Sequence, residues 1–274
     1  MSPLHAFLLG VLEGLTEFLP VSSTGHLFLL GLVLGHEDEA TKALDIVMQL
    51  GAVIAVVVYY RARLGSIARG VLTRDPASLR LLVALFIGFL PAAVVGLALH
   101  KRIKASLMSA YPIAGALIVG GVVMIAIEAY RSRKGEEGLN GLEHVTPKRA
   151  LIIGLSQCFS LWPGASRSMS TIVGGQLSGL STATAAEFSF LLAVPTLGAA
   201  TVFDLIKHGH EIMAAPGGAI ALAVSMGVSF VVALLVIAGF ISYLKRFGLA
   251  PFGWYRIVLG VAVIALVLRS ASHG

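Results

Sequence analysis

The chain has 274 residues, of which 57% are hydrophobic and only 12% are charged, with a mean hydropathy of +0.91 and a formal net charge of +6. Soluble domains carry about a quarter charged residues, so this composition excludes an ordinary soluble protein and indicates one that crosses a membrane several times. The basic residues stand in short loops between apolar stretches, where they orient spans. We therefore expect no nucleic-acid partner.

Taken in chain order, six apolar segments are long enough to cross a bilayer. They are residues 43–60, 79–99, 111–130, 187–206, 218–243 and 251–269. Two further apolar regions, 4–35 and 150–180, are each interrupted by a polar loop with proline, so that each half is too short to cross alone. The pattern predicts an all-α polytopic membrane protein with six full spans and two re-entrant helical hairpins.

The two interrupted regions resemble each other. EGLTEFLPVSS, which begins at Glu13, parallels QCFSLWPGAS, which begins at Gln157, with one gap, and each region precedes three spans. Because three is an odd number, the second copy must be inverted relative to the first, as in many transporters with broken helices. We expect a single membrane domain, 1–274, with repeat 1 at about 1–135 and repeat 2 at about 145–274. The two polar loops should then face each other inside the protein.

The distribution of basic residues predicts the orientation. Arginines and lysines gather in the loops 61–80 and 131–149 and in the turn at Lys245 and Arg246, which all fall on one side of such a topology. The positive-inside rule makes that side cytoplasmic. Both termini are then expected on the periplasmic side.

Glu13 and Glu17 are two carboxylates within the first interrupted region. They are four residues apart, hence on one face of a helix, and ionisable residues inside a membrane are costly and usually functional. Together they offer two carboxylates to a cation or a proton. The alternative is that each merely pairs with a buried arginine such as Arg167.

The first polar loop, Pro20 to His26, ends one half-helix and starts the next. Serine and threonine are preferred helix N-caps, so the backbone N–H groups of the new helix would point into the site and could bind phosphate. The hydroxyls of Ser22, Ser23 and Thr24 add phosphate contacts and a candidate nucleophile, and His26 adds a proton carrier. The alternative is ordinary capping beside a packed histidine.

The second polar loop repeats this design. Pro163 and Gly164 break the helix, and the next half opens with an arginine and several hydroxyls that can bind phosphate. These are Ser166, Arg167, Ser168 and Thr171. An arginine guanidinium offers a fork of donors that suits phosphate oxygens and stays charged in a dry site. We expect Arg167 to clamp the phosphate. Asp45, Gln49, Glu187 and Arg256 are further polar residues that could support the site, but they are left out of the catalytic set.

The stretch from Glu13 to His26, EGLTEFLPVSSTGH, and the stretch from Pro163, PGASRS, closely resemble the two signature motifs of the bacitracin-resistance type of undecaprenyl-diphosphate phosphatase. The resemblance extends over the whole chain, including the segments that begin at Gln49 and Glu187. One position departs from the family pattern, because Met169 stands where the family usually has glycine.

This resemblance implies roles for individual residues. Glu13 and Glu17 would be the acidic pair, Ser23 the nucleophile, His26 the acid or base, and Ser166, Arg167 and Thr171 the phosphate-binding group. It also implies dependence on a divalent cation, Mg²⁺ or Ca²⁺, held by the two glutamates. The location it implies is the bacterial inner membrane, with an active site that faces the periplasm.

The expected function is hydrolysis of undecaprenyl diphosphate to undecaprenyl phosphate and inorganic phosphate, which recycles the lipid carrier of cell-wall synthesis and confers bacitracin resistance. Attack by Ser23, by His26 or directly by water is left open, and so is a homodimer. The alternative function is a polyprenyl-phosphate flippase, since inverted repeats with broken helices are transporter architecture. A flippase needs charge complementarity but no nucleophile and no proton carrier.

Overall fold

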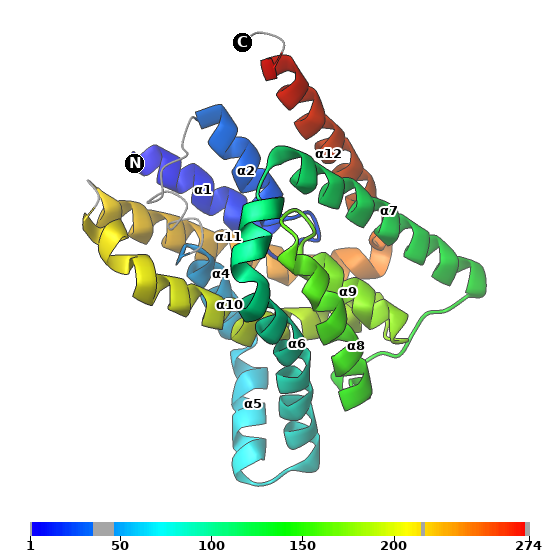
Figure 1. The fold of residues 1–274 in the computed structure, drawn as a ribbon. Coiled ribbons are helices and arrows are strands. Elements are labelled where there is room, and N and C mark those ends of the chain that lie inside the picture. The colour runs from blue at the N-terminus through cyan, green and yellow to red at the C-terminus, as the bar shows by residue number, and fades with distance from the viewer. Residues whose placement is uncertain (1, 35–46, 215–216, 272–274) are drawn as a thin grey trace.

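The computed structural model describes residues 2–34, 47–214 and 217–271, and over these residues the chain is helical (Figure 1). The helices are α1 (Pro3–Thr16), α2 (Ser23–Leu34), α4 (Gln49–Tyr59), α5 (Arg61–Leu72), α6 (Pro76–Leu107), α7 (Ala110–Lys134), α8 (Pro147–Gln157), α9 (Arg167–Leu177), α10 (Thr182–Ala214), α11 (Gly218–Phe247) and α12 (Ala250–Ala271). Short 3-10 helices, η1 and η2, cover Leu142–His144 and Cys158–Leu161. In the described ranges, β structure is limited to one isolated bridge between Leu139 and Leu180, which confirms the all-α class.

Five helices in the described part of the chain are long and apolar enough to cross a membrane. They comprise Pro76–Leu99 of α6, Ala110–Lys134 of α7, Thr182–Lys207 of α10, Gly218–Phe247 of α11 and Ala250–Arg269 of α12. Five of the predicted spans fall within them. Large apolar side chains such as Leu97, Leu235 and Val258 are largely exposed on their outer faces. So much exposed apolar surface is suited to a lipid environment.

Over its described residues, the predicted span 43–60 corresponds to the single helix α4 (Gln49–Tyr59), and a bend lies just beyond it. Residues 43–46 lie outside the described ranges, α4 begins at Gln49, and α5 follows it with a bend of 71°. The loop predicted after residue 60 is therefore wrong, because Arg61–Leu72 is helical. This segment is amphipathic: it buries Ile67 and packs against α6, while its arginines stay on the surface. The count of candidate spans is five, or six if the bent pair is one span.

Each of the two interrupted regions folds as a pair of short helices around a break. The break between α1 and α2 contains Pro20, and the break between η2 and α9 contains Pro163. Proline and serine define the helix starts. Pro3 and Pro147 occupy the first turns of α1 and α8, and the Ser166 side chain caps α9 by accepting a hydrogen bond from the Met169 N–H. The predicted breaks are confirmed.

Helices from the two halves of the chain pack on each other in equivalent pairs, if α1, α4 and α6 of the first half are compared with α8, α10 and α11 of the second. Helix α1 lies along α11, and α8 lies along α6; α4 packs on α11, and α10 packs on α6. Helix α7 pairs with α12, and α4 pairs with α10. The α5–α6 hairpin projects from one end of the molecule, and α1 and the end of α12 lie away from it (Figure 1).

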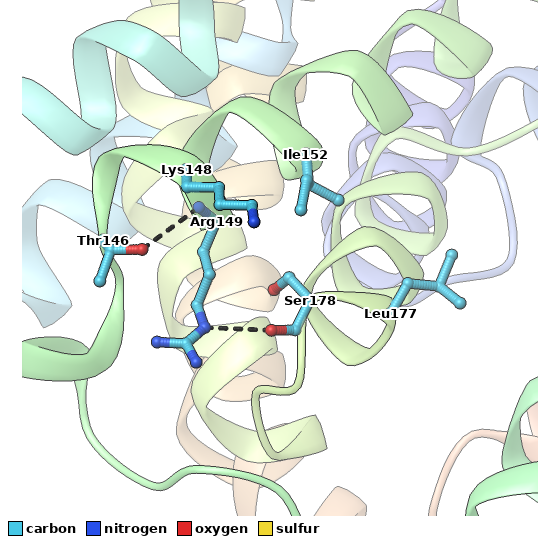
Figure 2. A pocket seen from close by; sticks show the side chains of 6 residues that line it. All are labelled: Thr146, Lys148, Arg149, Ile152, Leu177 and Ser178. Atoms are coloured by element: carbon cyan, nitrogen blue, oxygen red, sulfur yellow. Dashed lines mark hydrogen bonds between the residues drawn. The ribbon is translucent and has the colours of Figure 1, made fainter.

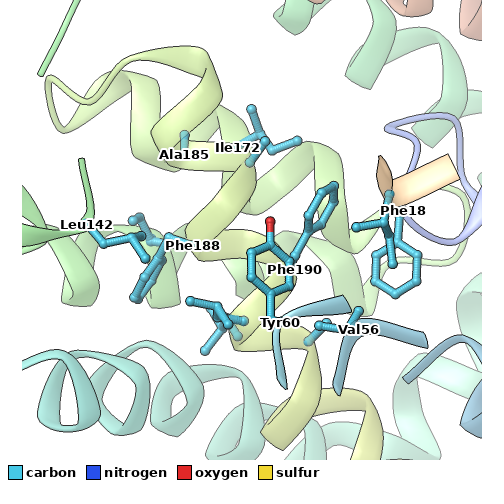
Figure 3. Packing of buried hydrophobic residues seen from close by; sticks show 14 of the residues in the cluster. Phe18, Val56, Tyr60, Leu142, Ile172, Ala185, Phe188 and Phe190 are labelled. Atoms are coloured by element: carbon cyan, nitrogen blue, oxygen red, sulfur yellow. The ribbon is translucent and has the colours of Figure 1, made fainter. Parts of the chain in front are cut away.

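The main hydrophobic core lies beside the first polar loop (Figure 3). Phe18, two residues before that loop, is fully buried and meets Phe190 of α10 edge to face, with ring centroids 5.3 Å apart. Phe18 follows Glu17 in the chain, and Phe190 follows Ser189. This aromatic contact therefore brings Glu17 close to α10, and the polar site forms at that junction.

Candidate active site

The two polar loops meet inside the protein, as the sequence predicted. The Ser168 hydroxyl, in the first turn of α9, donates at 2.9 Å to the carbonyl of Leu19, which directly precedes the first loop. A salt bridge joins the same two segments: Arg167 Nη2 lies 3.1 Å from Glu17 Oε1, and both side chains are buried. Residues about 150 positions apart in the chain thus form one cluster.

Glu17 also bonds to the candidate nucleophile. The Ser23 hydroxyl, at the first residue of α2, donates to Glu17 Oε2 at 2.7 Å. One carboxylate oxygen therefore contacts the arginine and the other contacts the serine. Because an ionised carboxylate only accepts hydrogen bonds, Glu17 is placed to take the serine proton.

Arg167 is held from two sides. Besides Glu17, its guanidinium bonds through Nη1 to Ser189, at 3.1 Å to the carbonyl and 3.2 Å to the hydroxyl. Its Nε–H is buried and has no hydrogen-bond partner among the described residues. A buried cation with an unused donor, at the first residue of α9, is suited to an anionic ligand.

Glu13 lies one helical turn before Glu17, since the Glu17 N–H donates to the Glu13 carbonyl at 2.9 Å. Its side chain is fully buried, and its carboxylate interacts electrostatically with Arg167. Mg²⁺ is commonly held by one or two carboxylates together with substrate phosphates, whereas Ca²⁺ takes six to eight oxygen ligands. In the ranges that the structure describes, no group of three or more acidic, His or Cys side chains could hold a metal. Glu13 and Glu17 are the residues that could supply the one or two carboxylates of such a Mg²⁺ site.

His26 is buried near the start of α2, but its ring nitrogens are bonded away from Ser23. Nδ1 lies 2.8 Å from the Ser22 carbonyl, and Nε2 lies 2.6 Å from the Tyr255 hydroxyl on α12. A carbonyl oxygen can only accept, so Nδ1 carries a proton. No sequence motif pointed to Tyr255, which lies 229 residues from His26 in the chain.

The remaining predicted hydroxyls divide into two groups. Thr24 and Ser166 are partly buried at the starts of α2 and α9. Thr171 and Ser168 are fully buried and bond to protein: the Thr171 hydroxyl lies 2.9 Å from the Arg167 carbonyl and 2.6 Å from the Ser189 hydroxyl. Ser189 was missed because it is an isolated polar residue in an apolar segment.

Arg256 connects the two loops from α12. It is fully buried, and its guanidinium donates to the Pro20 carbonyl of the first loop at 3.2 Å and to the Gly164 carbonyl of the second at 3.0 Å. It also donates to the carbonyls of Ala116 and Leu117 on α7. The expectation that Arg256 supports the site agrees with these contacts.

The other expected supporting residues are placed differently. Asp45 lies outside the described residues, and Gln49 is the first residue of α4. Glu187 is partly buried, and its charged neighbours are Arg63, Glu143 and Lys245. Glu187 therefore lies near these charged residues of α5, η1 and α11, and not in the cluster formed by the two loops.

A cavity of about 450 Å³ lies apart from the cluster, at the start of α8 and the end of α9 (Figure 2). It is lined by Thr146, Lys148, Arg149, Ile152, Leu177 and Ser178. Arg149 bonds there to the carbonyls of Ser178 and His144. None of the predicted catalytic or phosphate-binding residues lines this cavity, so the candidate site stays at the loop pair.

Comparison with known proteins gives consistent matches. A family model described as bacitracin resistance protein BacA matches residues 6–262. An undecaprenyl-diphosphatase of Sorangium cellulosum (strain So ce56) is 69% identical over 261 residues, covering 95% of this chain and 85% of the relative. Proteins of the same name from Rhizorhabdus wittichii and Thermoanaerobacter sp. (strain X514) are 45% and 44% identical; the alignments cover 98% of both chains for the first and 96% of both for the second.

Proposed function

The chain belongs to the bacitracin resistance protein BacA family, and on that premise we propose that it hydrolyses undecaprenyl diphosphate to undecaprenyl phosphate and inorganic phosphate. The observation that carries this proposal is the chain of contacts from Ser23 through Glu17 to Arg167, at 2.7 Å and 3.1 Å. It unites a nucleophile, a base and a phosphate-binding cation in one buried cluster. The product would return the lipid carrier to cell-wall synthesis, and abundant enzyme would raise resistance to bacitracin.

In the proposed first step, Ser23 Oγ attacks the terminal phosphorus. The bond from that phosphorus to the bridging oxygen breaks, and undecaprenyl phosphate leaves with the bonding electron pair. The serine proton passes to Glu17, whose Oε2 already accepts the serine hydroxyl. Water then attacks the phosphorus of the phosphoserine, and the bond from phosphorus to Ser23 Oγ breaks. Inorganic phosphate is released, and Oγ recovers its proton from Glu17, which restores both residues.

The structure alters the proton assignment made from sequence. His26 was the acid or base candidate, but the group bonded to Ser23 is Glu17. We therefore propose Glu17 as the base for serine attack and His26 as the proton carrier for the water step. Direct attack by water and attack by His26 are the competing mechanisms.

We propose that Arg167 and the two helix N-termini bind the phosphates. The buried Nε–H of Arg167 is the donor that a phosphoryl oxygen would engage. Ser22, Thr24 and Ser166 would add contacts from the first turns. Ser168 and Thr171 would act indirectly, since their hydroxyls bond to Leu19 and to the α9 backbone and so hold Arg167 and its loop in place.

We propose Glu13 and Glu17 as the protein ligands of a divalent cation, with Mg²⁺ preferred. When bound, such an ion supplies positive charge that offsets the charge on the phosphoryl oxygens. Arg167, which is bonded to Glu17, would add its own positive charge. Positioning with electrostatic stabilisation dominates phosphoryl transfer.

We propose that the chain lies in the bacterial inner membrane as an inverted repeat, with α1–α2 and α8–α9 as re-entrant hairpins and the site open to the periplasm. The reciprocal packing of α1 on α11 and of α8 on α6 supports the repeat. The polyprenyl tail would lie among the apolar outer helices while the diphosphate meets the loops. One copy supplies every residue of the proposed site, so a homodimer is not required.

The flippase alternative has less support. It accounts for the repeat, but it gives no role to a serine hydroxyl bonded to a buried carboxylate. The relatives are also named as hydrolases.

The test is phosphate release from undecaprenyl diphosphate by the purified protein in detergent. We expect the natural chain to release phosphate and Glu17→Gln to lose about 10²–10⁴-fold in rate, the usual contribution of a general base. Glu137→Gln, at an exposed carboxylate in the linker after α7, is the matched control and should keep full activity. Absence of release from folded natural protein, together with lipid movement in vesicles, would overturn the proposal in favour of the flippase.

A further inference from the structure

Tyr255 lies beside the active site although no sequence motif includes it. It comes from α12, and its hydroxyl is 2.6 Å from Nε2 of His26, with the two rings inclined by only 5°. The tyrosine is 46% exposed, whereas His26 is 8% exposed. The phenol therefore joins the buried imidazole to the outer surface of the protein.

With the hydrogen bond to Tyr255, both ring nitrogens of His26 are bonded to the protein, so the orientation of the ring is set. Since Nδ1–H donates to the Ser22 carbonyl, Nε2 of the neutral ring has only a lone pair and accepts the phenolic proton. When Nε2 becomes protonated, the phenol oxygen can accept in turn, so the contact persists in both states. Turning the imidazole would break both hydrogen bonds.

The same bonds reach the backbone beside the nucleophile. Ser22 has φ +71°, a conformation that non-glycine residues rarely adopt, and its carbonyl is the one held by His26. Such conformations persist only where the surroundings enforce them. Tyr255, His26 and the Ser22 peptide thus form a chain of contacts that ends next to Ser23.

Tyr255 is itself well fixed. Arg256, the next residue, is fully buried and bonds to the Pro20 and Gly164 carbonyls. The backbone of α12 at this point is therefore tied to both loops, and the distance from Tyr255 to His26 is set by packing.

We propose that Tyr255 is a positioning residue of the phosphatase reaction, which holds His26 in the Nδ1–H tautomer and, through it, holds the Ser22 peptide. The inference rests on the proposed function, because it assigns Tyr255 to the same site. It adds a second side chain of α12, beside Arg256, to the surroundings of the two loops.

The first test is Tyr255→Phe, which keeps the ring and removes the hydroxyl. We expect kcat for phosphate release to fall on the order of tenfold, the size found for groups that orient a functional histidine. KM should change less than about twofold, because Arg167 and the N-terminus of α9 are unaltered. Tyr111→Phe on α7, where the side chain is 55% exposed, is the matched control and should leave both constants unchanged.

A double-mutant cycle separates positioning from a structural role. In a His26→Gln background, Tyr255→Phe should change kcat less than about twofold, because the group that it orients is gone. A merely structural tyrosine would lower the rate by the same factor in both backgrounds. That additive result would overturn the proposal.

Nitrogen NMR of ¹⁵N-histidine-labelled protein in detergent gives a readout besides activity. The His26 signals, assigned by their loss in His26→Gln, should show the Nδ1–H tautomer in the natural chain and should shift toward mixed tautomers in Tyr255→Phe. Unchanged His26 signals would contradict the proposal. An active natural chain with an equally active Tyr255→Phe would overturn the role of Tyr255 alone, whereas an inactive natural chain would overturn the proposed function and this role with it.

Discussion

Ser22 and Ser166 adopt the same rare turn, with φ +71° and +72°. Each hydroxyl accepts a backbone N–H three residues later, from Gly25 at 3.2 Å and from Met169 at 3.3 Å. The residue after each serine opens a new helix, and there the two loops differ: Ser23 follows Ser22, and Arg167 follows Ser166. One backbone design thus carries the proposed nucleophile in one half and the phosphate-binding cation in the other.

The two halves also differ in the helices that precede these loops. Glu13 in the first half corresponds to Gln157 in the second, and both side chains are fully buried. Gln157 donates to the Gly88 carbonyl and accepts from Thr196, so it is satisfied by neutral protein groups. The two buried carboxylates of the loop cluster, Glu13 and Glu17, therefore both come from the first half of the chain.

Substituting Arg167 by lysine should abolish most activity while keeping the charge. A single ammonium cannot reproduce the bonds to Glu17 and to Ser189 and also offer a donor to phosphate. We expect kcat/KM to fall by about 100-fold or more, which corresponds to about 2.7 kcal/mol of transition-state stabilisation.

The control for this substitution is Arg131→Lys. Arg131 is also buried, and it donates to the carbonyls of Gln176 and Glu136 at the far end of α9. Thermal unfolding and phosphate release should be measured on both variants. Equal losses of activity at equal stability would argue against a specific role for Arg167.

Gly120→Ala should weaken the connection between the loops. A Cβ at Gly120 would lie 2.3 Å from Nη2 of Arg256, so the buried guanidinium would have to leave its carbonyl partners. Overpacking of this kind costs about 1–3 kcal/mol. We expect a lower unfolding midpoint in detergent and reduced phosphate release.

Gly115→Ala on the same helix provides the comparison. A Cβ there would find its nearest neighbour, the Trp162 ring, only at 4.0 Å. This variant should keep the natural midpoint and rate. Matching behaviour of the two glycine variants would show that the space at Arg256 is unimportant.

Removal of divalent cations should slow the natural chain, and Glu13→Gln should weaken its response to added Mg²⁺. Glu13 is buried within electrostatic reach of Arg167, and its carboxylate is proposed to bind the cation together with Glu17 and the substrate. The measurement is the Mg²⁺ dependence of phosphate release after chelation. Full activity of both proteins in excess chelator would refute the metal proposal.

The proposed orientation can be tested by cysteine labelling in intact cells, with Cys158→Ser as the background. Cysteines at Arg74, after α5, and at Glu137, after α7, should react only when the cytoplasm is accessible, since both stand in exposed basic segments. A cysteine at Met108, between α6 and α7, should react from outside. Labelling at Arg74 and Glu137 from outside, and at Met108 only from the cytoplasm, would contradict the proposed orientation and with it a site open to the periplasm.

The helical class, the two broken helix pairs and the meeting of their loops were predicted from sequence. Prolines break helices locally, and charged residues within apolar segments must lie inside the protein. The sequence did not predict α5, whose arginines suggested a loop although Ile67 is buried on its other face. Tyr255 and Ser189 were missed because each is brought to the site by tertiary packing. The bond of Ser23 to Glu17 in place of His26 depends on side-chain direction, which residue spacing alone does not determine.

In the proposed mechanism Ser23, activated by Glu17, attacks the terminal phosphate. This step can be tested by rapid acid quenching of the purified protein with undecaprenyl diphosphate that carries a labelled terminal phosphate. Phosphoserine survives acid, whereas phosphohistidine does not. We expect a labelled phosphoserine at residue 23 that forms within one turnover, is absent from Ser23→Ala and is strongly reduced in Glu17→Gln. Release of labelled phosphate with no phosphoserine, together with full activity of Ser23→Ala, would contradict it and favour attack by water or by His26.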